Sequence, residues 1–209
     1  MKLSLCITCW SGDAHLLDRC LQEFTKQTVA PDEIIISSSN LNKSPCEISS
    51  IKIADKIVPI KKVNRAQRGL HGFPRNQGAD NCSSDFIMFF DVDDIPHPDK
   101  IDTTLKIVSS NPTCDAFLHN YYLDATTFQQ FSTIPVEKII QKDSQSTNLI
   151  ASDGIHHGHL TIRPEIVRKI RYNENRTLGE DGEFCQSVFD SGYTILYCPH
   201  KLLCYVTEK

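Results

Sequence analysis

Short hydrophobic runs with little polar alternation recur along the first half of the chain. They occupy residues 3–9, 33–37, 57–60 and 85–90. Runs of this length and composition are typical of strands that are buried on both faces of a sheet. The run at 85–90 is the most continuous of them and predicts a strand most clearly.

The segments between these runs have helical spacing instead. In residues 13–26 the apolar side chains fall on one face of a helix that Asp13 can cap. Pro74 and Pro98 suit the first turn of helices that end near residues 82 and 109. This alternation predicts an α/β fold, with a mostly parallel central sheet that helices cover on both faces.

Polar clusters follow three of the predicted strands, at residues 8–10, 37–40 and 91–94. In open parallel sheets ligands bind beyond the carboxyl ends of the strands, so we expect these clusters to converge on one rim. The basic stretch at 61–72 predicts a loop, which is either a lid over a ligand or a solvated surface loop.

The second half of the chain is less regular. Strands are expected at 114–118, 155–162 and 193–198, a short helix after Pro164 and another at 183–190, while 128–148 is ambiguous. No repeat and no linker rich in Gly, Ser or Pro separates two domains. We therefore expect one domain over residues 1–209, with halves at about 1–98 and 99–209.

Composition and charge narrow the class of function. The chain has 209 residues and a net charge of −4, which argues against nucleic acid or an anionic membrane as the main partner. No apolar run approaches the roughly 18–20 residues of a bilayer span, and the N-terminus makes a poor signal peptide. These features predict a cytoplasmic protein whose nine cysteines are reduced thiols. Cys6 and Cys9 have redox spacing but lie inside a predicted strand.

The acidic loop after the run at 85–90 contains Asp91, Asp93 and Asp94. Carboxylates crowded at the mouth of a sheet repel one another unless a cation is present. Mg²⁺ and Mn²⁺ prefer such oxygen ligands, often together with substrate phosphates. The alternative is a set of helix caps before Pro98, although capping needs one Asp and not three.

Three further features carry candidate chemistry. Glu180 and Asp181 stand between two glycines at a predicted helix start, where a carboxylate serves either as a general base or as a cap. Arg75 either grips a diphosphate, orients an acidic residue or is a solvated residue on the helix surface. His157 and His159 share one face if their segment is a strand. There, His159 either reaches the site or is a structural group.

The order of these motifs resembles that of GT-A glycosyltransferases of the family 2 type. The motifs are Thr8-Cys9-Trp10, Ser37-Ser38-Ser39-Asn40, Arg75-Asn76-x-Gly78, Asp91-x-Asp93-Asp94, His157-x-x-Leu160-x-x-Arg163 and Glu180-Asp181. The resemblance covers nearly the whole chain. It implies a GT-A fold whose first half binds a nucleotide-sugar, usually of UDP, and whose smaller second half binds the acceptor, a glycan or another hydroxyl compound.

The resemblance also implies roles for individual residues. The donor would lie against Thr8, Cys9, Trp10, Ser37, Ser38, Asn40, Arg65, Arg75, Asn76, Asp91 and Val92. Mn²⁺ or Mg²⁺ would be held by Asp91, Asp93 and His159. Asp181 would be the catalytic base, with Glu180 beside it to place the acceptor.

One base and one displacement predict inversion at the sugar C1. The nucleoside diphosphate that leaves gathers negative charge, which the cation and Arg65, Arg68 or Arg75 would stabilise. Two other functions remain open: a sugar nucleotidyltransferase, and a nucleotide-sugar or glycan-binding module without turnover. No motif identifies the sugar or the acceptor.

Overall fold

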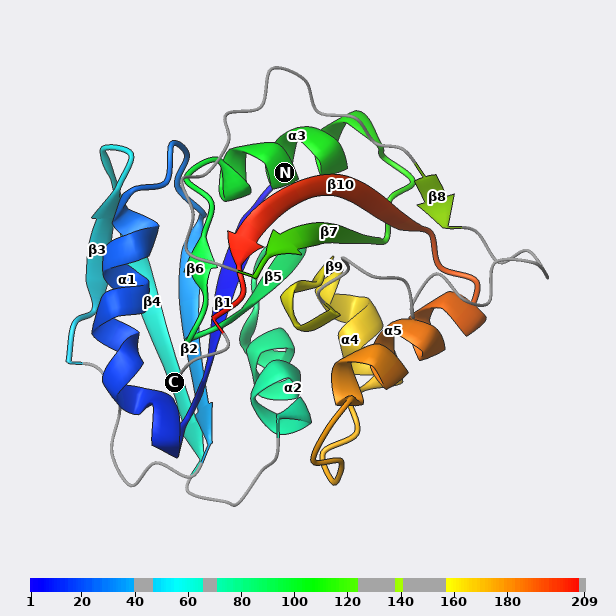
Figure 1. Ribbon diagram of the computed structural model, residues 1–209, viewed down its shortest axis with the longest axis horizontal. Coiled ribbons are helices and arrows are strands. Elements are labelled where there is room, and N and C mark those ends of the chain that lie inside the picture. Colours follow the sequence, from blue (N-terminus) through cyan, green and yellow to red (C-terminus); the bar gives the residue numbers. More distant parts are fainter. Residues whose placement is uncertain (40–46, 66–70, 124–137, 141–156, 207–209) are drawn as a thin grey trace.

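The computed structural model describes residues 1–39, 47–65, 71–123, 138–140 and 157–206 (Figure 1). The strands are β1 (Leu3–Trp10), β2 (Glu33–Ser39), β3 (Ser50–Ile53), β4 (Lys56–Arg65), β5 (Phe86–Asp91), β6 (Ile95–Pro96), β7 (Ala116–Tyr122), β8 (Lys138–Ile140), β9 (Thr161–Ile162) and β10 (Ile195–Cys204). The helices are α1 (Leu17–Thr25), α2 (Gly72–Asn81), α3 (Lys100–Ser110), α4 (Pro164–Ile170) and α5 (Glu180–Asp190), with 3-10 turns η1 (Ser11–Leu16) and η3 (His157–His159).

The strands form one sheet in the order β3-β4-β2-β1-β5-β9-β7-β10-β6, and β8 pairs with β10. β4, β2, β1 and β5 pair in parallel, as do β7 and β10. The short β9 joins β5 to β7 by pairing antiparallel with both. The long strands therefore all run in one direction, and the predicted mostly parallel sheet flanked by helices is confirmed.

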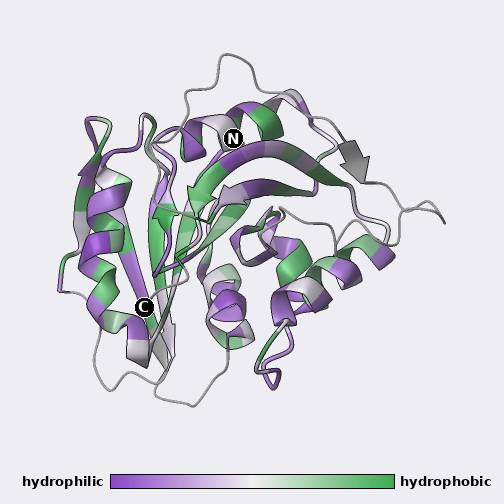
Figure 2. Cartoon of the chain, viewed as in Figure 1, coloured by the Kyte–Doolittle hydropathy of each residue, from purple (hydrophilic) through white to green (hydrophobic). Residues whose placement is uncertain are grey.

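Helices cover both faces of this sheet, and the alternation along each strand decides which side chain meets which layer. In β1, Leu5 and Ile7 belong to the cluster that packs under α1 and α3. Cys6 belongs to the cluster on the other face, under α2, α4 and α5. The central strands are accordingly mostly hydrophobic in Figure 2, whereas the outer sides of the helices are largely polar.

The predicted basic loop at 61–72 is wrong for its first part, because residues 61–65 belong to β4 and pair with β2. The lysines fit there because their long stems carry the ammonium groups away from the sheet. Lys61 Nζ donates to the carbonyl of Asn81, and Lys62 Nζ to that of Glu47. Residues 66–70, including Arg68, lie outside the described part of the chain.

The predicted strand at 155–162 is also mostly wrong. Only Thr161 and Ile162 form β9, while 157–159 make the turn η3, so His157 and His159 do not share a strand face. Residues 155–156 and, apart from β8, the ambiguous 128–148 segment lie outside the described residues. No helix among the residues that the structure describes is long and apolar enough to cross a bilayer.

Candidate active site

The acidic loop begins at the carboxyl end of β5, as predicted, and β1 holds its first residue. Thr8 lies opposite Asp91 in the parallel pairing of β1 with β5. Its hydroxyl donates to Asp91 Oδ1 at 2.6 Å, and the backbone N–H of Val92 donates to the Thr8 carbonyl at 3.2 Å. A strand pair buried on both faces thus fixes where the loop starts.

Arg75, on α2, joins the acidic loop to the start of α5. One terminal nitrogen donates to both carboxylate oxygens of Asp91, at 2.9 and 3.1 Å, and the other donates to Glu180 Oε1 at 2.9 Å. The Arg75 side chain is only 4% exposed and that of Glu180 7%. Two acidic motifs far apart in the sequence therefore meet across one guanidinium.

Neighbouring groups keep the buried Arg75 side chain positively charged. Burial alone disfavours the guanidinium, but Asp91, Tyr172 and Glu180 outweigh it and hold the pKa of Arg75 above its ordinary value. The guanidinium also lies 5.7 Å from the centre of the Tyr172 ring, which stacks on Phe184 of α5. Arg75 is thus a fixed cation between the two acids.

The helix that carries Arg75 lies close to the sheet because residue 78 is glycine. A Cβ atom there would lie 2.3 Å from the Cys6 sulfur of β1, far inside contact distance. Any larger residue would push α2 outward and move Arg75 away from Asp91. The glycine of the Arg75-Asn76-x-Gly78 motif is therefore explained by packing.

Asp94 has different surroundings from Asp91. Its side chain is fully buried, its Oδ2 lies 2.7 Å from Nε2 of His159, and its Oδ1 accepts the backbone N–H of Val206 at 3.0 Å. Burial, with Asp91 nearby, raises the pKa of the Asp94 carboxyl to about 8. His159 in turn meets the Phe90 ring edge to face, with the ring centres 4.5 Å apart.

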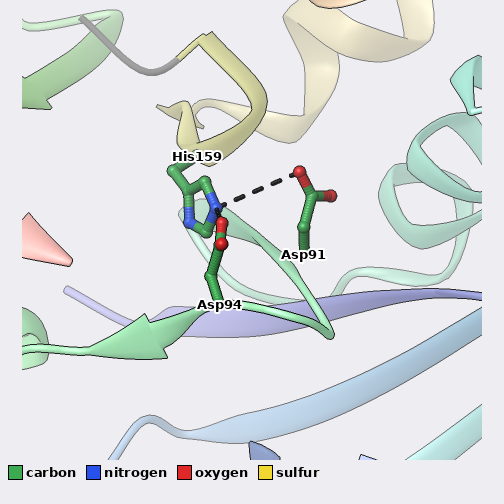
Figure 3. A group of neighbouring side chains, drawn as sticks. All are labelled: Asp91, Asp94 and His159. Atoms are coloured by element: carbon green, nitrogen blue, oxygen red, sulfur yellow. Dashed lines mark hydrogen bonds and ion pairs between the residues drawn. The ribbon is translucent and has the colours of Figure 1, made fainter. Parts of the chain in front are cut away.

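Asp91, Asp94 and His159 form a group that could hold a metal ion (Figure 3). Each offers one ligand atom, and these atoms all lie within 4.8 Å of one another. Asp93, the predicted ligand, is not in this group, and its backbone carbonyl accepts a 2.6 Å hydrogen bond from Arg19 of α1. Coordination by Asp93 stays a prediction, and Asp94 is the ligand candidate that sequence reasoning missed.

A lysine and a histidine are buried in the core near this group. Lys100 of α3 and His119 of β7 are almost fully buried, and Lys100 Nζ contacts His119 Nε2 directly. Burial lowers the pKa of Lys100 to about 7, although the charge of Asp94 works in the opposite direction. The core next to the acidic loop therefore contains a pair of buried polar side chains, Lys100 and His119.

The residues predicted to contact the donor base lie at the ends of β1 and β2. Cys9, Ser37 and Ser38 are buried, and the Ser37 hydroxyl donates to the Pro74 carbonyl at 2.7 Å. Trp10 is 47% exposed, and its contact with the donor stays a prediction. Asn40 and the side chain of Arg65 lie outside the described residues.

Asn76 has a structural role in addition to its predicted contact with the donor. Its amide donates to the Tyr172 carbonyl at 2.9 Å and to Glu174 Oε1 at 2.8 Å, and its oxygen accepts the Tyr172 N–H at 2.9 Å. These bonds fasten α2 to the segment before α5. Its predicted contact with the donor remains untested.

α5 begins at Glu180, three residues earlier than expected, after Gly179 with φ of 74°. This start places Glu180 inward on Arg75 and leaves Asp181 half-buried beside it. Asp181 Oδ1 accepts the backbone N–H of Gly182 at 2.8 Å, and its charge reaches Arg75. The predicted base therefore lies at the same end of α5 as the residue that is tied to the acidic loop.

Comparisons with known proteins find one matching family model and a set of similar solved structures. Residues 4–171 match the family model described as glycosyl transferase family 2. No curated protein matches. Among solved structures, TarS 1–349 of S. aureus in complex with UDP-GlcNAc has a TM-score of 0.73 at 13% identity, covering 100% of this chain and 59% of that one.

Two further structures show the same fold. The UDP complex of S. aureus TarS 1–349 has a TM-score of 0.70 at 13% identity, covering 100% of this chain and 61% of its own. The mannosyltransferase PcManGT from Pyrobaculum calidifontis, in complex with GDP-Man and Mn²⁺, has a TM-score of 0.67 at 12% identity, covering 100% and 57%. The chain spans about three fifths of the length of these TarS structures.

Proposed function

Because the chain belongs to glycosyl transferase family 2, we propose that it transfers a sugar from a nucleoside diphosphate sugar to an acceptor hydroxyl, with inversion at C1. UDP is the nucleotide we expect, since similar structures were solved with UDP and UDP-GlcNAc. PcManGT was solved with GDP-Man, so GDP-sugars belong in the test as well.

The observation that carries this proposal is the contact of Arg75 with both Asp91 and Glu180. It brings the acidic loop, where a donor diphosphate would lie, next to the helix start that carries Asp181. A transferase needs both groups at one place, one toward the leaving nucleotide and one toward the acceptor. A protein that only bound a nucleotide would have no use for the second group.

The residues present suit a divalent cation. Two carboxylates and one imidazole with converging ligand atoms are a donor set that Mn²⁺ accepts well and Mg²⁺ accepts through its oxygens. Asp91, Asp94 and His159 would hold the ion, and Asp93 remains a further candidate. A cation bound there would supply positive charge to the leaving diphosphate.

Other side chains then divide the remaining work. The acceptor oxygen attacks C1 while the bond from C1 to the diphosphate oxygen breaks, and the acceptor proton passes to the carboxylate of Asp181. Glu180 is bound to Arg75 and so positions the helix start rather than taking the proton. Arg75 itself is engaged by two acids, which favours the orienting role over direct grip on the diphosphate.

The test is Asp181→Asn, with Asp190→Asn at the other end of α5 as its control. We expect transfer to fall about 10²–10⁴-fold, the usual contribution of a placed base. Donor binding measured by calorimetry with Mn²⁺ should stay the same. An equal loss of transfer and binding would contradict the role of Asp181 as base.

A donor panel defines the substrate. Each UDP- and GDP-sugar, with Mn²⁺, is scored by the rise in unfolding temperature, because a ligand of the folded state stabilises it. We expect a UDP-sugar to give the largest rise. Binding without transfer or donor hydrolysis would favour a binding module instead.

A further inference from the structure

The last strand of the chain returns to the acidic loop. β10 runs beside β7 and then pairs antiparallel with β6, Leu203 opposite Pro96 and Cys204 opposite Ile95 (Figure 1). Directly after the strand, the backbone N–H of Val206 donates to Asp94 Oδ1 at 3.0 Å. This bond joins residues 112 positions apart in the chain.

The geometry of this N–H is well determined by its neighbours. Leu202, Leu203 and Cys204 are at most 1% exposed, and the His97 N–H donates to the Leu202 carbonyl at 3.0 Å. On the other side, the Tyr205 N–H donates to the Tyr122 carbonyl at 2.8 Å. The segment is thus bonded to β6 and β7 immediately before it reaches Asp94.

The bond decides which oxygen of Asp94 faces the candidate cation site. Oδ1 accepts the Val206 N–H, so Oδ2 is the oxygen that lies 2.7 Å from His159 and belongs to the group with Asp91. Hydrogen bonds to the outer side of a ligand fix its orientation, and their loss typically weakens metal binding. Because Val206 lies beyond residue 171, this contact is outside the region matched by the family model.

We propose that the backbone N–H of Val206 is a positioning group for the cation site, holding the Asp94 carboxylate so that Oδ2 stays with His159 and Asp91. The inference rests on the proposed metal-dependent function. Val206 contributes through its main chain, so its side chain is expected to matter little. Val206, which follows β10, thereby becomes part of the proposed site.

The recombinant test compares Val206→Pro, which removes the N–H, with Val206→Ala, which keeps it. Mn²⁺ binding to the full chain, without donor, is followed through the electron paramagnetic resonance signal of the free ion. We expect Val206→Pro to weaken binding about 10–100-fold, as for other outer partners of metal ligands. Val206→Ala should bind as the unchanged chain does.

A second variant replaces the N–H by an ester oxygen and adds no proline ring. Cys204 allows a peptide of residues 204–209 to be ligated to a thioester of residues 1–203, with Val206 replaced by its α-hydroxy acid. The control is the same ligation with natural valine, and both products are refolded as full chains. The ester variant should show the same loss of Mn²⁺ affinity, and the width of its bound Mn²⁺ signal should change because the ligand geometry is less constrained.

The outcomes distinguish a failure of the proposed metal-dependent function from a failure of the positioning role of Val206. If the unchanged chain binds no Mn²⁺, the metal in the proposed function is wrong and this inference fails with it. If it binds Mn²⁺ and the ester variant binds equally well, only the positioning role is overturned. A loss in Val206→Ala as large as in Val206→Pro would assign the effect to the side chain and would also overturn it.

Discussion

Asp91 and Asp94 stand three residues apart on one loop, yet their surroundings are opposite. Asp91 is 28% exposed and accepts hydrogen bonds from Thr8 and from the Arg75 guanidinium. Asp94 is fully buried, and its nearest charged neighbours include Asp91 itself. Burial and that neighbour raise the pKa of Asp94 to about 8. Burial also lowers the pKa of the Lys100 amine, to about 7.

The difference shows that two carboxylates of one loop are held by different partners. The fixed guanidinium of Arg75 compensates the charge of Asp91. Asp94 is bonded instead to His159 and to the Val206 N–H, and under the proposed function a divalent ion held with Asp91 and His159 would add positive charge beside it. A run of aspartates in a sequence does not reveal this division of roles.

The largest expected effect comes from removing the compensating cation with Arg75→Met. Glu180 would be left buried and unpaired, so the free energy of unfolding should fall by about 3–5 kcal/mol. Urea unfolding measures this loss. Arg176→Met is the matched control, because its pair with Glu183 is exposed on both sides and should contribute about 0–1 kcal/mol. A loss as small for Arg75 as for Arg176 would contradict the compensation of Asp91.

The buried amine of Lys100, near Asp94, is tested with Lys100→Met. The free energy of unfolding of this variant is compared with that of the chain that keeps the lysine, at pH 6 and pH 9. The pKa of Lys100 is lowered to about 7 in the folded state from an ordinary 10.5, so between these values the unfolded chain binds the extra proton and stability rises with pH. The methionine does not titrate and avoids the buried charge. The gain in free energy of unfolding from lysine to methionine should therefore be larger at pH 6 than at pH 9. The difference should be about 2–3 kcal/mol, because the folded and unfolded chains differ by this proton over the two pH units between 7 and 9.

Two features keep this comparison specific to Lys100. The charge of Lys100 lowers the pKa of Asp94, so both proteins also carry Asp94→Asn, which removes the opposite pH dependence of that carboxyl. Lys106→Met, on the same helix, removes an exposed lysine paired with Asp102 and should show the same difference from the unchanged chain at both pH values. A Lys100→Met difference that is independent of pH would mean that the amine keeps its ordinary pKa.

The sequence predicted the central strands well because their runs are hydrophobic on both faces. The strands expected at 3–9, 33–37 and 85–90 appear within two residues of their bounds. The strand expected at 57–60 lies inside β4, but β3 and its hairpin with β4 were missed, since the turn consists of Ala54 and Asp55, both at positive φ. Turns of this kind usually contain Asn or Gly, so these residues give no signal of a hairpin.

The candidate site was only partly predictable for a related reason. The acidic loop and the Glu180-Asp181 pair are visible as letters, and Arg75 was expected to grip a diphosphate, to orient an acid or to be a solvated surface residue. The roles of Asp94 and Val206 depend on tertiary contacts. A backbone N–H that reaches a carboxylate from a distant strand leaves no mark in the sequence, because every residue except proline has one.

The smallest expected effect concerns the hydrogen bond that Thr8 donates to Asp91. Thr8→Val keeps the shape of the side chain but removes the hydroxyl that donates to Asp91 Oδ1 at 2.6 Å. A hydrogen bond to a charged group contributes about 1.5–3 kcal/mol, and partial exposure of Asp91 favours the lower figure.

Thr161→Val provides the control for this change. Thr161 is fully buried in β9, and its hydroxyl has no hydrogen-bond partner among the residues that the structure describes, so valine there should be neutral or stabilising. Thermal unfolding of the two variants separates a hydroxyl that positions Asp91 from one that is merely buried. If both substitutions changed stability alike, the loss of a γ-hydroxyl from the sheet would explain the result, and Arg75 alone would account for the position of Asp91.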